Sequence, residues 1–503
     1  MFPAFGWTVI LCAAGFAAAL LIYVWGVADA FMNRGLVGQA KKAWLGVLVS
    51  PALIALIFFA FKDRTTAAGV LGLGVLASIA YWFSSPGEAK TFRGSWNIAA
   101  AFVTFGISTG LPYYNITFFF DYLRDDHGWP AEFVTFGAPV AVLLTIWAGP
   151  MIVPRISPRL LIVIGTGLSF LAFQGFGNLS GDSEFEYYAC WCLYMLGYFL
   201  SGPIPHQIII SNWYKERRGL AMGLTYVGVG VIGATGNILS PSLAAEMEYT
   251  QALQVMGCLL LLAWPLALLV IKDKPEDVGQ YADGAHADSA AVAAAAATPE
   301  SKSFGFLMSK SAFWFLLVGS AASIGSIAAV NFLLKFVLEE QGFVDQGARD
   351  AVWASASSIY LLSSIGGRLL AGWLADVFPR KWVMLVTYLI VALSIPLLFL
   401  ITPETPHFVY LFAVCFGFAL GADYMLIPLM AADQFGLKSL AKAMSAILPS
   451  DTISQFWFPT MVARLATMWG GYASALWAVF GMAALGAAAI GLLPRNHKPV
   501  DEE

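Results

Sequence analysis

The sequence predicts an all-α membrane protein, in which a twelve-span bundle of two six-helix halves follows three additional N-terminal transmembrane helices. Of the 503 residues, 59% are hydrophobic and only 12% are charged, whereas a soluble domain carries about 25% charged residues. The apolar residues are gathered in runs of about 20, the length with which a helix crosses the hydrocarbon of a bilayer. One polar segment divides the last twelve runs into two sets of six.

Fifteen apolar runs follow one another along the chain. Each is expected to be a helix, because a backbone in lipid must satisfy its own hydrogen bonds. The first three lie near 7–28, 43–62 and 66–84 and form an N-terminal extension over 1–94. The other twelve lie near 97–121, 132–152, 158–178, 187–210, 219–243, 250–272, 312–336, 350–373, 381–401, 407–431, 440–465 and 470–493.

Lysine and arginine are distributed unequally between the connecting loops. If the run near 97–121 begins in the cytoplasm, most of the 27 basic residues lie on the cytoplasmic side, as the positive-inside rule requires. These include Arg155, Arg159, Lys215, Arg217, Arg218, Arg380, Lys381, Lys438 and Lys442. The distribution predicts a multi-pass protein of the inner or plasma membrane, with its N-terminus outside and its tail, 496–503, in the cytoplasm. A net charge of −4 argues against a nucleic-acid partner.

The segment 273–310 separates an N-terminal half, 95–272, from a C-terminal half, 311–495. Its Ala-rich stretch has too little apolar bulk to fold alone and predicts a cytoplasmic linker. The first span of each half ends in an acidic loop closed by Gly and an aromatic residue, YLRDDHGW at 122–129 and FVLEEQGF at 336–343. Two like halves predict a substrate site near the membrane midplane that is reached alternately from the two sides, which is the mechanism of a secondary transporter.

The loop after the second span of the C-terminal half reads GWLADVFPRK (372–381). It resembles the G-x-L-x-D-x-x-x-R-[KR] loop of the major facilitator superfamily, with Gly372, Asp376, Arg380 and Lys381 at the matching positions. The resemblance covers about 95–495. It implies that the carboxylate and the basic pair form a conformational loop that clamps helix ends.

Several stretches resemble the monocarboxylate and oxalate/formate porters of that superfamily. They are GISTGLPYYNITFFFDYLRDDHGW (106–129), SNWYKERRGLAMG (211–223), KPEDVGQYADG (274–284), SSIGGRLLAGWLAD (363–376) and GADYMLIPLMAADQFGLKS (421–439). This resemblance implies transport of small organic anions, monocarboxylates above all, by proton symport or anion exchange. The expected partners are a small carboxylate, a proton or counter-anion, and membrane lipid.

Arg368 is the strongest candidate for binding the substrate. It corresponds to the intramembrane arginine that binds the carboxylate in the monocarboxylate porters, and its planar fork matches a carboxylate bidentately. A guanidinium in hydrocarbon is costly, so it normally faces a cavity and a partner. Further candidates that could line the cavity are Tyr113, Tyr114, Asn115 and Asn331.

Three titratable residues are candidates for proton coupling. The resemblance places Asp423 and Asp451 in spans that line the cavity, where each carboxylate could carry a proton or form a fixed ion pair with Arg368. His206 could titrate near neutral pH or be a hydrogen-bonded structural residue. Lys335 lies near the outer end of its span, where a long side chain is expected to snorkel toward the interface.

No P-loop, nucleophile elbow or His/Cys metal cluster occurs in the sequence, so neither an enzyme nor a cofactor is expected. Two alternatives to organic-anion transport stay open. The extra N-terminal helices fit a transporter-like receptor or assembly subunit that has lost transport. An efflux pump for amphipathic compounds is the other alternative.

The orientation can be tested with a topology reporter fused at residue 290, in the linker. We expect activity only from a reporter that works in the cytoplasm, because the basic loops place this segment inside. A signal from a reporter that requires the outer side would show that the span count is wrong.

Overall fold

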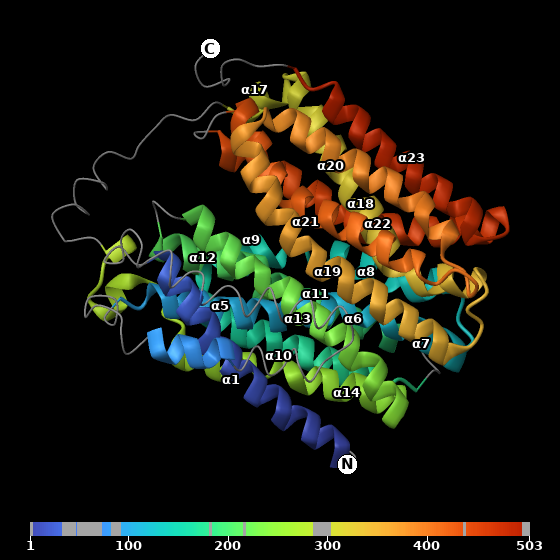
Figure 1. Ribbon diagram of the computed structural model, residues 1–503, viewed down its shortest axis with the longest axis horizontal. Helices are drawn as coiled ribbons and strands as arrows, with labels where there is room; N and C mark the ends of the chain where they lie inside the picture. The colour runs from blue at the N-terminus through green and yellow to red at the C-terminus, as the bar shows by residue number, and fades with distance from the viewer. Residues whose placement is uncertain are drawn as a thin grey trace. The chain divides into compact units, whose positions relative to one another are not determined.

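The computed structural model describes residues 4–32, 47, 73–81, 92–180, 184–214, 218–284, 303–435 and 439–494 (Figure 1). Every regular element within these ranges is a helix, which confirms the all-α prediction for the described part of the chain. Eight helices of this part are long and apolar enough to cross a membrane. The number of fifteen spans stays a prediction, since the second N-terminal run lies almost entirely outside the described residues and the third does so in part.

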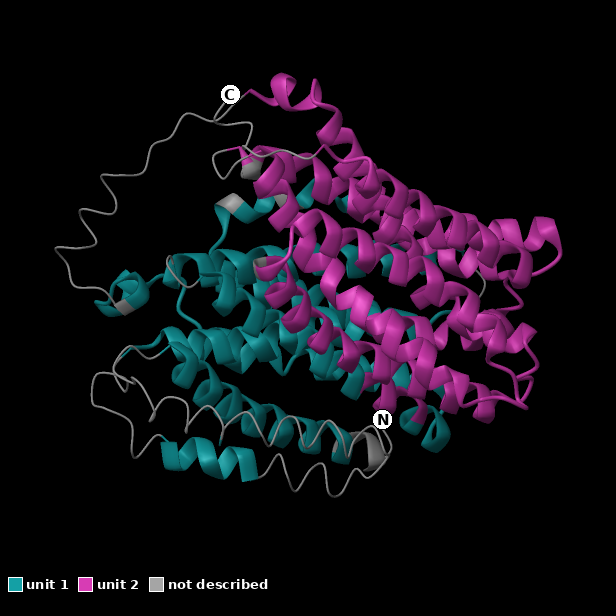
Figure 2. Ribbon diagram, turned by 45° about the horizontal axis from the view of Figure 1, so that its top comes forward, with its two compact units in different colours: residues 1–113, 144–235, 242–297 teal, residues 114–143, 236–241, 298–503 magenta. Residues whose placement is uncertain are grey.

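The chain forms two compact units, shown in teal and magenta in Figure 2. Unit 1 comprises 1–113, 144–235 and 242–297. Its helices are α1 (Ala4–Met32), α5 (Gly94–Phe105), α9 (Ala148–Ile152), α10 (Pro158–Phe176), α11 (Glu184–Ser201), α12 (Pro203–Trp213), α14 (Tyr249–Leu260) and most of α13 (Arg218–Glu246).

Unit 2 comprises 114–143, 236–241 and 298–503. Its helices are α7 (Phe120–His127), most of α8 (Ala131–Thr145), α17 (Phe304–Met308), α18 (Ser311–Glu340), α19 (Gln346–Val377), α20 (Arg380–Ser394), α21 (Phe408–Phe435), α22 (Leu440–Trp469) and α23 (Tyr472–Gly491). The short helix α6 (Leu111–Asn115) lies where the chain passes from unit 1 to unit 2. Each of the twelve core runs expected from the sequence coincides with one or more of these helices.

The acidic loops that resemble each other in sequence also end their helices in the same way. Gly128 follows α7 with φ +65°, and Gly342 lies just beyond α18 with φ +104°. Both angles lie in the left-handed region, which glycine adopts without the steric cost that a Cβ brings. The repeated glycine therefore has a backbone role at the end of each first span.

The fourth core run is divided into two helices at Gly202, between α11 and α12. Pro203 is the first residue of α12. Proline fits this position because its missing N–H would have no partner in the first helical turn, and it cannot continue α11, where that N–H is required. Pro203 therefore begins a new helix at this point.

Helices α19 and α21 pack through their backbones. A Cβ at Gly417 or Gly421 would overlap the carbonyl oxygens of Tyr360 and Ser364, and a Cβ at Gly367 would overlap that of Phe418. Small residues four apart allow helices to approach this closely in membranes. The crossing therefore fixes the position of α19 against α21 without depending on long side chains.

The N-terminal extension is attached to the core of unit 1 by a buried carboxylate. Asp29 of α1 accepts hydrogen bonds from Tyr81 Oη at 2.7 Å and from Ser95 Oγ of α5 at 2.8 Å. Trp25 stacks on Trp96, with ring centroids 5.0 Å apart. One aspartate thus joins α1, the helix over 73–81 and the first core span.

Removing this carboxylate should loosen the extension. We expect Tyr81→Phe and Ser95→Ala each to cost about 0.6–1.7 kcal/mol, the range measured for hydrogen bonds between membrane helices. Asp29→Ala should cost more than either, since it leaves both hydroxyls without this acceptor. The measurement is thermal unfolding of the purified protein, with the exposed Cys12→Ala on the same helix as control. An unchanged transition in Asp29→Ala would show that the carboxylate does not hold the extension.

Candidate functional site

Arg368 lies in the second half of α19, and its side chain is half-buried. The preceding Gly367 packs on the backbone of Phe418, so this turn of α19 is held at the crossing with α21. Ser364, one turn earlier, is buried and donates to a backbone carbonyl of its own helix. This serine therefore adds no charge beside the guanidinium.

Three of the five predicted substrate-binding residues come together in unit 2. The Arg368 guanidinium lies close enough to the Tyr114 hydroxyl to act on it electrostatically, and Tyr114 has the same relation to Tyr360. The Tyr360 hydroxyl donates to Oδ1 of Asn331. We call Tyr114, Asn331, Tyr360 and Arg368 the arginine cluster. Tyr360 was missed in the sequence because it belongs to no motif.

The arginine cluster contains a buried donor that lacks an acceptor. Asn331 is 2% exposed, and its Nδ2 has no hydrogen-bond partner among the described residues. An unsatisfied buried N–H costs roughly 1–3 kcal/mol. A guanidinium, a phenol and an unsatisfied amide together provide the donors that an oxygen anion requires.

The other two predicted substrate-binding residues have different surroundings. Asn115 is buried and accepts a hydrogen bond from Ser240 Oγ at 3.0 Å. Tyr113 belongs to unit 1, where its ring lies 6.2 Å from that of Tyr198. Asn237 of unit 2 is buried as well, and neither polar atom of its side chain has a hydrogen-bond partner in the described part of the chain.

Asp423 of α21 and Asp451 of α22 form a second polar cluster of unit 2, which we call the acidic pair. Ser323 Oγ donates to Asp423 Oδ2 at 2.6 Å, and Ser320 Oγ donates to Asp451 Oδ1 at 2.6 Å. The two serines are three residues apart on α18 and therefore point to one face of that helix. The carboxylates are close enough to repel each other. The serines, like Tyr360, had no motif that marked them.

The acidic pair is embedded in apolar side chains. Asp423 is 0% and Asp451 6% exposed, and the buried core around them includes Ile324, Leu426 and Ile447. Among the described residues, neither carboxylate makes an ion pair, so the fixed pairing with Arg368 considered from the sequence is not seen.

His206, the third proton-coupling candidate, lies in unit 1 and is hydrogen-bonded at both ring nitrogens. Nδ1 lies 2.7 Å from the Gly202 carbonyl oxygen, and Nε2 lies 2.9 Å from Thr104 Oγ1. The ring also stacks on Phe105. A carbonyl only accepts, so in a neutral imidazole Nδ1 carries the proton. Nε2 can then accept from Thr104 Oγ1 only when that hydroxyl does not donate to the Ala100 carbonyl, 2.9 Å away. This environment supports a structural role as fully as a titrating one.

The predicted conformational loop connects helix ends within unit 2. Arg380, at the start of α20, pairs with Asp433 near the end of α21. Lys381 Nζ donates to the Leu493 carbonyl beyond α23 at 2.6 Å. Gly372 lies against the Met425 side chain. The side chain of Asp376, the fourth member, lies outside the described part of the structure.

A buried ion network links α7, α18 and α19. Lys335 Nζ lies 2.7 Å from Asp121 and 2.6 Å from Asp350, and Arg349 lies 3.2 Å from Asp121. Glu339 pairs with Arg349 and, through both guanidinium N–H groups, with Arg124. We call these six residues, three acids and three bases, the Lys335 network; Arg124 also pairs with Asp125, whose side chain is 53% exposed.

The expectation that Lys335 snorkels toward the interface is wrong. Its side chain is 2% exposed and also donates to the Phe118 carbonyl at 2.9 Å. Its ammonium lies over the rings of Phe118 and Tyr122, and Tyr122 donates to Asp350 at 2.6 Å. Position near the end of a span suggested an exposed head group, whereas acids from two other segments keep the charge inside.

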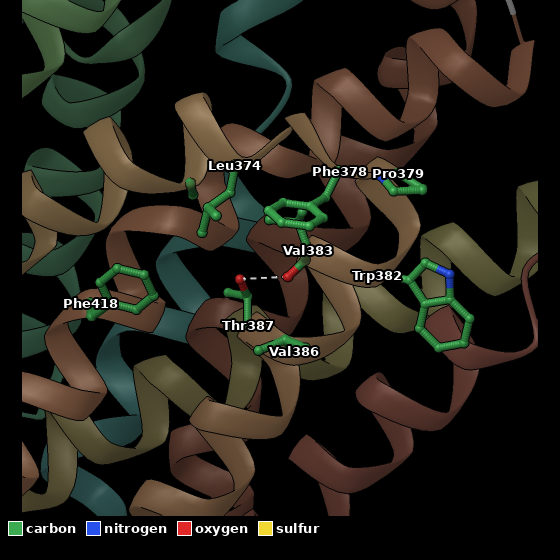
Figure 3. A pocket seen from close by; sticks show the side chains of 9 residues that line it. Leu374, Phe378, Pro379, Trp382, Val383, Val386, Thr387 and Phe418 are labelled. Carbon is green, nitrogen blue, oxygen red and sulfur yellow. Dashed lines mark hydrogen bonds between the residues drawn. The ribbon is translucent and has the colours of Figure 1, made fainter. Parts of the chain in front are cut away.

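Figure 3 shows an apolar crevice of about 370 Å³ between α19, α20 and α21. Thr387 is its polar residue, and that hydroxyl donates to the Val383 carbonyl of its own helix. Phe378 and Trp382 are exposed at its rim. Such a lining suits lipid chains, and the crevice contains no member of the arginine cluster or the acidic pair.

Long apolar helices that carry buried charges at defined points characterise a polytopic membrane protein with internal polar sites. The chain matches the family model described as Major Facilitator Superfamily over residues 98–359 and 345–503. It therefore belongs to this superfamily and is a membrane transporter.

Solved transporter structures share this fold at low sequence identity. One is a bacterial homolog of the human lysosomal transporter Spinster, in an inward-facing and unoccupied conformation (14% identity, TM-score 0.51, covering 80% of this chain and 95% of that one). Another is the peptide transporter POT in complex with sulfate (14% identity, TM-score 0.59, covering 79% of this chain and 94% of that one). A third is the nucleoside transporter NupG (11% identity, TM-score 0.59, covering 79% of this chain and 99% of that one). No curated protein matches the chain in sequence.

The Lys335 network should be essential for stability. Lys335→Met leaves two buried acids without their shared cation, and breaking a buried pair in this way costs about 3–5 kcal/mol. Lys335→Met combined with Asp121→Asn should recover part of that loss. Thermal unfolding of the purified variants measures both effects.

The control for this prediction is the ion pair of Arg464 with Glu132, whose arginine side chain is 62% exposed. Arg464→Ala should cost no more than about 1 kcal/mol, as exposed pairs do. Equal losses in Lys335→Met and Arg464→Ala would contradict the role assigned to the network.

Proposed function

We propose that this transporter moves small organic anions, monocarboxylates above all, by alternating access coupled to proton symport or anion exchange. The observation that carries the proposal is the arginine cluster, in which Arg368 acts electrostatically on Tyr114 and Tyr114 on Tyr360. Tyr360 in turn bonds to Asn331, whose Nδ2 is unsatisfied. A carboxylate would accept two parallel hydrogen bonds from the guanidinium. The amide and the phenol would orient the remainder of the molecule.

The sequence resemblance to the monocarboxylate and oxalate/formate porters supports the same substrate class. Two of its five stretches contain Arg368 and Asp423, and both residues lie in polar clusters of unit 2. Peptide and nucleoside transporters share the fold, so the fold alone does not select the substrate. The selection rests on the donors of the arginine cluster.

The division into an extension (1–94), two halves (95–272 and 311–495) and a cytoplasmic linker (273–310) belongs to the same proposal. So do the orientation, with the N-terminus outside and the C-terminus inside, and the inner or plasma membrane as location. Alternating access requires two halves that can move around a central site.

The attachment of the extension to the first core span through Asp29 is the observation that favours the receptor or assembly-subunit alternative. A partner bound to the extension could act on the core through that connection. Transport remains the better proposal, because a protein without transport has no need for the costly buried groups of the arginine cluster and the acidic pair.

Arg368 provides the direct test of the substrate class. Lysine keeps the charge but loses the planar fork. Losing one charge-assisted hydrogen bond costs about 1.5–3 kcal/mol, so Arg368→Lys should weaken carboxylate binding about ten- to a hundredfold. Arg368→Ala should abolish it. The measurement is binding and proteoliposome uptake of radiolabelled monocarboxylates and dicarboxylates, with purified variants whose unfolding has been checked.

Arg464→Ala is the matched control, since this arginine is exposed and pairs with Glu132. It should leave carboxylate affinity unchanged. Near-normal affinity in well-folded Arg368→Ala would overturn the anion-binding role and favour a neutral or cationic substrate.

A further inference from the structure

The acidic pair raises a question of charge balance that organic-anion binding does not answer. Two carboxylates lie in the apolar core of unit 2, and their hydrogen-bond partners among the described residues are hydroxyls. Burying one uncompensated charge is costly, and a second one beside it adds repulsion. In the Lys335 network, by contrast, each acid pairs with at least one base.

A third side chain also points to a ligand. Tyr388 of α20 is fully buried, and its hydroxyl faces Asp423 closely enough to act on it electrostatically. The two groups interact as a weak hydrogen bond, and neither this hydroxyl nor Asp423 Oδ1 has a partner with full hydrogen-bond geometry among the described residues. Two buried oxygen atoms that face each other without a well-formed hydrogen bond could both contact a small ligand that binds oxygen.

The polar groups that contact the pair within the described part of the chain are oxygen atoms, and none is a base. Helix α18 contributes the hydroxyls of Ser320 and Ser323, α20 that of Tyr388, and α21 and α22 one carboxylate each. Within the described residues, no lysine, arginine or histidine pairs with either acid. Carboxylate and hydroxyl oxygens are hard ligands, which suit a proton or a small hard metal cation.

We propose that Asp423 and Asp451 act together as one site for a single monovalent cation, a proton or Na⁺. Ser320, Ser323 and Tyr388 complete the site. The inference deepens the proposed function, since it identifies the coupling ion as a cation bound within unit 2, and it rests on that function for its role in transport. Binding of the cation needs no organic anion and is therefore tested without one.

The first test uses the purified full-length protein with no substrate present. In Na⁺-free buffer at neutral pH, a shared proton gives the infrared C=O band of one protonated carboxylic acid. The proton is retained because two ionised carboxylates would repel each other. Asp423→Asn and Asp451→Asn each leave a single carboxylate, so each should remove that band. If Na⁺ is the ion, NaCl should raise the unfolding temperature where choline chloride does not, and both variants should lose this rise.

Ser326→Ala is the control, because this serine lies on the same helix and bonds only to backbone carbonyls. It should keep the signals of the unsubstituted protein. Either the proton signal or the Na⁺ signal supports the site, provided that both aspartate variants remove it. Absence of both signals overturns the proposal, and so does a signal removed by only one of the two substitutions.

A second test asks whether the two acids form one site in transport. For a single shared site, Asp423→Asn, Asp451→Asn and the double variant should lose cation-driven accumulation to the same degree, since coupled groups are not additive. All three should keep counterflow exchange, which needs no net cation movement. Additive losses would show two independent groups. Failed carboxylate binding together with intact cation signals would reject the substrate class and leave the cation site standing.

Discussion

The cost of a charge in an apolar medium is the constraint on which this structure depends. A helix in lipid can bury an ionised side chain only if a partner neutralises it. The Lys335 network meets this condition with side chains alone, because each of its buried acids pairs with at least one base. The acidic pair has hydroxyl partners and no base. The difference separates a charge cluster that stabilises the fold from one that requires a ligand.

Backbone packing brings the two candidate sites into one rigid part of unit 2. Gly417 and Gly421 of α21 lie against the carbonyls of α19, and Asp423 follows two residues after the second glycine. Arg368 follows directly after Gly367, which takes part in the same crossing. Close-packed helices move together rather than deform, so we expect a displacement of α21 at the acidic pair to reach the arginine cluster on α19.

Motifs that lie within a single helix could be predicted from the sequence, whereas contacts between side chains of different helices could not. The apolar runs, the superfamily loop, Arg368 and Asp423 are signals within single segments, and each could be recognised there. Lys335 was misinterpreted because its acids, Asp121 and Asp350, come from two other segments. Tyr360, Tyr388 and the α18 serines belong to no motif, and only the helix packing brings them to the polar clusters.

The two coupling modes that the sequence left open differ in what happens to the acidic pair. A pair that keeps its cation throughout the cycle has a constant charge. The free-energy cost of rearranging its helices is then the same with or without the bound anion, and the transporter exchanges one anion for another. A pair that releases its cation exposes two repelling carboxylates to the apolar core. Returning in that state is costly unless the carboxylates first reach water. Symport therefore requires a water path to Asp423 and Asp451 on one side of the membrane, whereas exchange requires none.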